Sequence, residues 1–157
     1  MSITYREAVY ADLQTLIELR LAYLTEDRGD LSDAETRQIR EQLTDYFARS
    51  LGNTFHAVVA EQDGEIIAAA FLALSEKPAN PAFITGKIGT ILNVYTKPPF
   101  RKQGIATGVL TLLIDRARQC ELSKLELSAT PVGKTLYEKL GFREKHSKYT
   151  DMQLRLR

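Results

Sequence analysis

A short basic segment of this sequence combines the residue types and spacing that suit anion binding. It begins at Arg101 and Lys102 and reaches Gly104, directly before an apolar run that predicts a helix from about Ile105. The first backbone N–H groups of a helix have no partner within the helix, so they attract anions and can bind a phosphate. Glycine at this place permits a close backbone approach. The segment therefore predicts a phosphate-binding loop that ends in a helix N-terminus.

A β-prone run lies directly before this loop and predicts a strand. It covers residues 91–96 and stops before Pro98 and Pro99, which lack the N–H group that a central strand needs. Asn93 interrupts the apolar character of this run. An asparagine inside a strand indicates either a functional side chain or a β-bulge. Both interpretations of Asn93 remain open at this point.

Two segments together resemble the signatures of one known family. The pattern Arg101-x-x-Gly104-x-Ala106 matches [Gln/Arg]-x-x-Gly-x-[Gly/Ala], and residues 136–142 read Leu-Tyr-Glu-Lys-Leu-Gly-Phe. In this order and separation they resemble the two signatures of the GCN5-related N-acetyltransferase (GNAT) superfamily. The resemblance implies an α+β (mixed α/β) fold, with a GNAT-type central and mostly antiparallel sheet flanked by helices.

The resemblance also implies acetyl coenzyme A (acetyl-CoA) as the co-substrate, with its pyrophosphate on the loop. It implies that the pantetheine arm pairs with the backbone at Val94 and Thr96, where the strand separates from its neighbour. A backbone N–H near residues 93–95 is then placed to stabilise an oxyanion, and one such donor is typically worth ~3 kcal/mol. The implied residues of the loop and first helical turn are Arg101, Lys102, Gln103, Gly104, Ile105, Ala106 and Thr107.

The resemblance places Tyr137 beside the coenzyme sulfur, which makes it the candidate general acid. Proton transfer from a phenol of pKa about 10 to a thiolate of pKa about 8.5 is uphill by only ~1.5 units. The alternative is that the Tyr137 ring merely packs beneath the co-substrate. Asn93 is the second candidate catalytic residue, and it would orient an activating water or hold the acceptor. Many family members have a glutamate in the preceding strand, whereas this sequence has Thr90 and Asn93, so no general base is assigned; Glu126 is a weaker candidate.

The function implied by the resemblance is N-acetyl transfer from acetyl-CoA to a primary amine of a small molecule or protein, by direct attack in a ternary complex. A non-catalytic domain that binds or senses acyl-CoA is the alternative, and a purely structural interaction domain is a third reading. The acceptor remains open between polyamine, aminoglycoside, amino acid and protein amine. The acidic turn with Glu26, Asp27 and Asp30 is a weak candidate for attracting a cationic amine.

The composition limits the expected binding partners and the expected cellular compartment. Lys and Arg total 21 against 20 for Asp and Glu, so the net charge of +1 does not favour nucleic acid or an anionic membrane as partners. The lone Cys120 excludes an internal disulfide and a multi-cysteine metal site, and a reducing compartment, the cytoplasm, is expected. The sequence has neither a signal core nor about 18 consecutive apolar residues. We therefore expect a metal-free single domain over residues 1–157; a homodimer is compatible with the resemblance.

Local patterns predict the elements that position these residues. A first helix follows Asp12 to about Leu24, with Glu18 and Arg20 facing water. Ser32 and Glu35 have the spacing of a capping box and predict a second helix that ends before residue 52. Strands are predicted over residues 3–7, 55–61, 65–74, 91–96 and 124–129, and the turn at residues 63–64 predicts a hairpin. A short helix from residue 131 to 141 and final strands at residue 142 and residues 152–156 complete the prediction.

Overall fold

The computed structural model describes residues 2–157 and divides the chain into two units, Met1–Leu127 and Ser128–Arg157. Within the described part of the first unit, one sheet has the strand order β1-β2-β3-β4-β5. The first three pairs are antiparallel, and β4 and β5 are parallel. The mixed, mostly antiparallel sheet agrees with the predicted fold class. The strands are β1 (Thr4–Glu7), β2 (Phe55–Gln62), β3 (Glu65–Glu76), β4 (Lys87–Thr96) and β5 (Lys124–Glu126).

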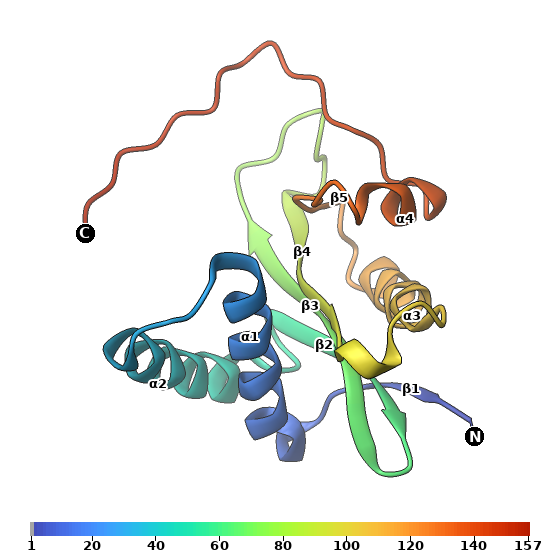
Figure 1. The fold of residues 1–157 in the computed structure, drawn as a ribbon. Helices are drawn as coiled ribbons and strands as arrows, with labels where there is room; N and C mark the ends of the chain where they lie inside the picture. The colour runs from blue at the N-terminus through green and yellow to red at the C-terminus, as the bar shows by residue number, and fades with distance from the viewer. Residues whose placement is uncertain (1) are drawn as a thin grey trace. The chain divides into compact units, whose positions relative to one another are not determined.

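Helices cover both faces of this sheet. Figure 1 shows α1 (Leu13–Arg28) and α2 (Asp33–Ser50) on one face and α3 (Ile105–Gln119) on the other. Short 3-10 turns, η1 (Tyr10–Asp12) and η2 (Pro98–Phe100), precede α1 and the loop before α3. The rings of Phe47, Phe55 and Phe71 pack together beneath α2, with centroids 4.8 to 5.6 Å apart. This cluster anchors α2 to β2 and β3.

Two local predictions are confirmed in detail. The Ser32 hydroxyl accepts the Glu35 N–H at 3.1 Å, and the Glu35 carboxylate accepts the Ser32 N–H at 3.0 Å, which is a capping box. In the hairpin between β2 and β3, Asp63 and Gly64 both have positive φ angles, 53° and 80°. Two-residue turns with positive φ match the twist of the strands that they join.

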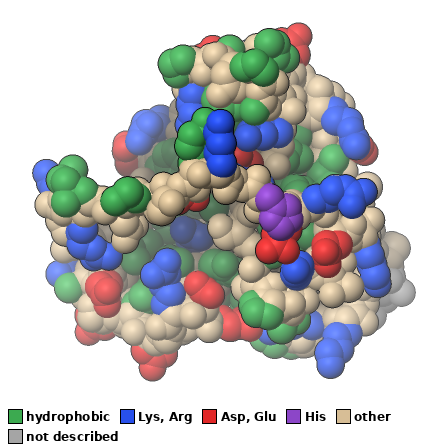
Figure 2. All heavy atoms as spheres, turned by 90° about the horizontal axis from the view of Figure 1, so that it is seen from above, with side chains coloured by type: hydrophobic (Ala, Val, Ile, Leu, Met, Phe, Trp, Pro, Cys, Tyr) green, Lys and Arg blue, Asp and Glu red, His purple; other side chains and the backbone are tan. Residues whose placement is uncertain are grey.

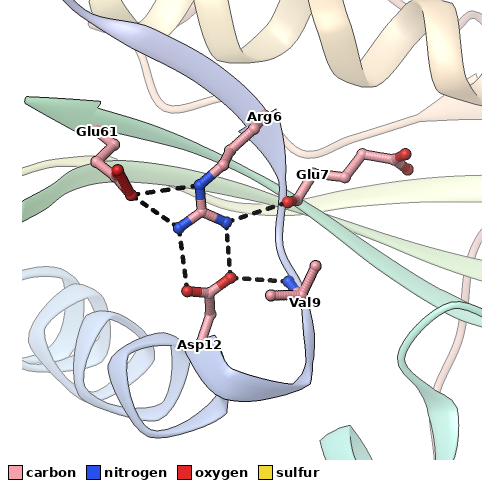
Figure 3. Close-up of polar contacts among 5 residues, drawn as sticks. All are labelled: Arg6, Glu7, Val9, Asp12 and Glu61. Carbon is pink, nitrogen blue, oxygen red and sulfur yellow. Dashed lines mark hydrogen bonds and ion pairs between the residues drawn. The ribbon is translucent and has the colours of Figure 1, made fainter. Parts of the chain in front are cut away.

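An ion-pair cluster fixes the start of α1 against β1 and β2 (Figure 3). The Arg6 guanidinium donates to both carboxylate oxygens of Asp12, at 2.8 and 3.1 Å, and to Glu61 at 2.9 Å. The Asp12 carboxylate also accepts the Val9 N–H at 2.7 Å. These hydrogen bonds from Arg6, followed by the one from Val9, lower the pKa of Asp12. The cluster holds the helix that faces β4 in a defined orientation.

A β-bulge interrupts β4 at Asn93. Phe71 of β3 pairs with Leu92, and Ala69 pairs with Tyr95, so Asn93 and its successor both lie opposite one residue of β3. Asn93 has a φ of 54°, a left-handed conformation that asparagine tolerates better than most residues. The bulge interpretation of Asn93 is therefore confirmed, and it does not exclude a role in the site.

The parallel pairing of β4 with β5 is short. It joins Ile88 through Thr90 to Lys124 through Glu126 and goes no further. Gly89 lies at its centre, where an added Cβ atom would be 2.7 Å from a methyl group of Leu125. Beyond Thr90, the backbone groups of β4 that point away from β3 have no strand partner in the described sheet. The sheet therefore opens along the second half of β4.

Several expected boundaries are wrong. β5 ends at Glu126 instead of residue 129, and no strand forms at residue 142 or residues 152–156 among the described residues. A strand needs a neighbour for its N–H and C=O groups, and apolar alternation alone does not supply one. Consequently, the side chains of that alternating run are exposed, namely Met152, Leu154 and Leu156.

The second unit contains one short helix, α4 (Lys134–Lys139), three residues later than the expected start at Pro131. The Thr130 hydroxyl accepts the Gly133 N–H at 3.1 Å and caps the turn that leads into α4. The helix ends at Lys139, and Gly141, the glycine expected to terminate it, follows two residues later with a φ of 102°. No helix among residues 2–157 is both long and apolar enough to cross a membrane. On the face drawn in Figure 2, positive and negative side chains are interspersed.

Candidate functional site

The predicted phosphate loop has the backbone geometry of an anion site. Gly104 is the N-cap residue of α3, with a φ of 79° and no side-chain cap. The first intrahelical bond of α3 runs from Gly108 N–H to the Gly104 carbonyl, at 3.2 Å. The N–H groups of Ile105, Ala106 and Thr107 therefore have no acceptor within the helix. An added Cβ at Gly104 would meet no atom within 4 Å, so this end of α3 has space beside it.

The Arg101 side chain binds protein groups at the same loop. Its guanidinium forms two hydrogen bonds with the Glu26 carboxylate, at 2.8 and 2.7 Å. Its Nε donates to the Thr96 carbonyl at 2.8 Å, and the guanidinium carbon lies 5.4 Å from the centre of the Tyr95 ring. The hydrogen bond from Arg101 lowers the pKa of Glu26. Arg101 therefore ties the loop to α1 and β4, and Glu26, a weak candidate for acceptor binding, is occupied by Arg101.

The open half of β4 suits a ligand that carries amide groups. Val94 lies in the bulge and Thr96 at the end of the strand, both beyond the pairing with β5. Backbone N–H and C=O groups without a strand partner can pair with the amides of an extended ligand. The Thr96 carbonyl already accepts one hydrogen bond, from Arg101 Nε. The loop and the strand edge together fit a molecule with a pyrophosphate and a diamide arm, as coenzyme A has.

The side chain of Asn93 contacts Arg20, which was expected to face water. Asn93 is only 3 % exposed; its Oδ1 accepts from Nη1 of Arg20 at 3.5 Å, and its Nδ2 has no partner. Arg20 is half-buried on α1, and burial lowers its pKa. The signal was present in the sequence, since Arg20 is four residues from both Leu16 and Leu24, on the apolar stripe of the helix.

Glu126, the weaker candidate base, has an ion-pair partner, and the buried residue His56 supplies no further candidate. Glu126 forms an ion pair with Lys124 at 3.0 Å. His56 is buried in β2, and burial is the main cause that lowers its pKa, so its neutral form is favoured. Among residues 2–157, no group of three or more potential metal ligands comes together. A general base remains unassigned.

Tyr137 lies in the second unit, on α4. Its ring packs edge-on against Phe142, with centroids 6.0 Å apart, and its carbonyl accepts the Phe142 N–H at 3.0 Å. An added Cβ at Gly133 would be 3.1 Å from the Tyr137 ring, so this glycine gives the ring its space. These contacts fix the tyrosine on its own helix, and its catalytic role stays a prediction.

Comparisons with known proteins identify the family. The model of the acetyltransferase (GNAT) family matches residues 13–142. No curated protein gives a significant match. Among solved structures, a predicted acetyltransferase with acetyl-CoA from Clostridium acetobutylicum is 27 % identical, with a TM-score of 0.81 over 97 % of this chain and 96 % of the other.

Two further structures share the fold. A GCN5-related N-acetyltransferase from Ralstonia eutropha JMP134 is 23 % identical, with a TM-score of 0.80 and coverage of 96 % and 99 %. Glucosamine-6-phosphate N-acetyltransferase from Arabidopsis thaliana is 24 % identical, with a TM-score of 0.67 and coverage of 97 % and 99 %. With the family model matching most of its length, this chain belongs to the acetyltransferase (GNAT) family.

Proposed function

We propose that this protein is an N-acetyltransferase that transfers the acetyl group of acetyl-CoA to a primary amine. One observation carries the proposal: the unpaired N–H groups that begin α3 lie at the end of the loop that follows the open half of β4. A single ligand with a pyrophosphate and an amide arm can use both. The acetyl-CoA in the Clostridium acetobutylicum structure supports this choice of co-substrate.

The residues of the chain have separate roles in this proposal. The amides of residues 105–107 hold the pyrophosphate, with Lys102 and Gln103 at the exposed side of the loop. The free edge of β4 at Val94 and Thr96 orients the amide arm, and a β4 N–H near the bulge stabilises the charge that develops on the acetyl oxygen. Acetyl-CoA supplies the acetyl group when bound. Orientation of both reactants accounts for much of the acceleration.

Proton transfers complete the proposed reaction. The amine nitrogen forms a bond to the acetyl carbon and loses a proton to water, while the carbon–sulfur bond breaks. Tyr137 donates its phenolic proton to the departing thiolate and regains one from solvent. This role rests on the likeness of residues 136–142 to the second family signature. Asn93 is proposed to contact the acceptor.

Release of coenzyme A from acetyl-CoA, measured with a panel of amines, tests the function. We expect amine-dependent thiol release together with saturable coenzyme A binding. If coenzyme A binds and no amine is acetylated, and Tyr137→Phe changes no rate, the protein is a sensor of acyl-CoA. If coenzyme A does not bind at all, the proposed site is wrong.

A further inference from the structure

Asn93 has a buried amide donor without a partner, and it lies beside the half-buried guanidinium of Arg20. The guanidinium has five N–H donors, and its single hydrogen bond to Asn93 is long, at 3.5 Å. Within residues 2–127, no carboxylate forms an ion pair with Arg20. The Asn93 Nδ2 group is buried and has no acceptor. A buried donor without a partner costs free energy, so an acceptor from a ligand would be stabilised here.

The orientation of the Asn93 amide is set by its neighbour. If Oδ1 and Nδ2 were exchanged, Nδ2 would face the Arg20 guanidinium, and two donors would meet. The orientation in the structure places Oδ1 toward Arg20 and leaves Nδ2 without a partner. The two side chains therefore form one donor-rich site, which we call the Arg20–Asn93 site.

The Arg20–Asn93 site lies beside the open half of β4. Asn93 is three residues beyond Thr90, the last residue of β4 that pairs with β5. Cross-strand neighbours point to the same face, so Leu92 shares the α1 and α2 face with its partner Phe71. Leu92 is nevertheless 40 % exposed, whereas Phe71 is buried. The α1 side of the bulge is therefore accessible next to the strand edge that is proposed to hold the acyl donor.

The charges around the site favour an anion over a second cation. Glu26 is engaged by Arg101 through two hydrogen bonds, so it is not a free carboxylate for a diamine. Asp27 is exposed and lies 3.9 Å from Arg28, and its attraction for the Arg20 guanidinium is smaller than the effect of burial on that group. A cationic group next to the half-buried Arg20 would be repelled at low effective dielectric. A carboxylate or phosphate would instead accept from the fork of guanidinium donors.

We propose that the acceptor amine carries an oxyanion, a carboxylate or a phosphate, and that Arg20 and the Asn93 amide bind it. The inference rests on the proposed acetyltransferase function, because it names the acceptor class of that reaction. A compact amino acid or amino phosphate fits this description. Polyamines and aminoglycosides, which lack an oxyanion, do not.

Steady-state kinetics with matched amines test the inference. O-phosphoethanolamine is compared with ethanolamine, and β-alanine with propylamine and 1,3-diaminopropane, at saturating acetyl-CoA. We expect the oxyanionic member of each comparison to have the higher kcat/KM, and Arg20→Gln to lower that value by about 100-fold. Arg20→Lys keeps the charge and should retain part of it. Arg28→Gln removes the same charge from an exposed position on the same helix and should leave kcat/KM within about 3-fold.

Binding is measured separately from turnover. In the ¹⁵N-labelled protein saturated with coenzyme A, the Asn93 side-chain amide resonance should shift on addition of inorganic phosphate, β-alanine or O-phosphoethanolamine. The shift should be absent with 1,3-diaminopropane and lost in Arg20→Gln. If none of the three oxyanions moves this resonance, or if Arg20→Gln leaves the kinetics of all amines unchanged, the acceptor class is wrong. Loss of coenzyme A binding or of all amine-dependent thiol release would instead contradict the proposed function.

Discussion

Replacement of Gly104 by aspartate tests the anion site at the start of α3. The substitution should leave the protein folded, because an added Cβ at Gly104 meets no atom within 4 Å. The φ of 79° is left-handed, a conformation that costs a non-glycine residue roughly 1–2 kcal/mol and aspartate less than most. We therefore expect the free energy of unfolding to fall by about 1 kcal/mol.

The effect on coenzyme A binding should be larger than the effect on folding. A carboxylate about 6 Å from one pyrophosphate charge, at an effective dielectric constant of about 20, opposes binding by ~3 kcal/mol. Competition of the same carboxylate for the free N–H groups acts in the same direction. Since about 1.4 kcal/mol corresponds to a factor of ten, the dissociation constant of coenzyme A should rise by about 100-fold.

Isothermal titration calorimetry with coenzyme A measures this change, and urea unfolding measures stability. Gly64→Asp is the matched control, because Gly64 has a φ of 80°, has no atom within 4 Å of an added Cβ, and lies in the hairpin turn between β2 and β3. It carries the same strain and charge and should bind coenzyme A normally. If Gly104→Asp is folded and binds coenzyme A within about 3-fold of the wild type, α3 does not hold the pyrophosphate.

Three further predictions concern other parts of the chain. The lowered pKa of Asp12 means that its ionised form is stabilised by folding, so this contribution is present above pH about 4 and is lost as the pH falls through the folded-state pKa. Urea unfolding from pH 7 to pH 2 should show a smaller loss for Asp12→Asn than for the wild type; equal slopes would contradict the role of the Arg6 pair. Tyr137→Phe should lower kcat by about 100-fold with a small change in KM for acetyl-CoA, and an unchanged kcat would leave Tyr137 as a packing residue. Gly108→Ala should cost about 1–2 kcal/mol in thermal or urea unfolding, because its Cβ would lie 2.2 Å from the Tyr5 ring, and the cost should shrink in a Tyr5→Ala background.

Predictions from the sequence succeeded where the cause is local. The capping box at Ser32, the hairpin turn at Gly64 and the start of α3 after Gly104 follow from residues that are adjacent in the chain. The type of sheet was also predicted correctly, because the two signatures resemble those of a family whose fold is known. These features need no knowledge of distant partners.

Predictions failed, or were not made, where the structure of a segment depends on a residue far away in the sequence. The run at residues 152–156 alternates as a strand would, yet among the described strands none pairs with it. Arg101 also donates to the Glu26 carboxylate, 75 residues away in the sequence, and no local pattern indicates this contact. Arg20 was assigned to water because arginine is usually exposed, although its helical position put it on the apolar stripe facing β4.

Helix α1 makes two polar contacts that matter for the proposed reaction: Glu26 binds Arg101, and Arg20 binds Asn93. Near its end the helix contacts the loop before α3 through Glu26 and Arg101, and less than two turns earlier it carries Arg20. If coenzyme A binding shifted this pair, α1 and Arg20, the proposed acceptor contact, would be displaced with it. Thermodynamic reciprocity then requires that acceptor and donor change each other's affinity by one common factor. In a Glu26→Gln variant that factor should move toward one, so the energetic coupling between the two substrates would depend on a single side-chain contact.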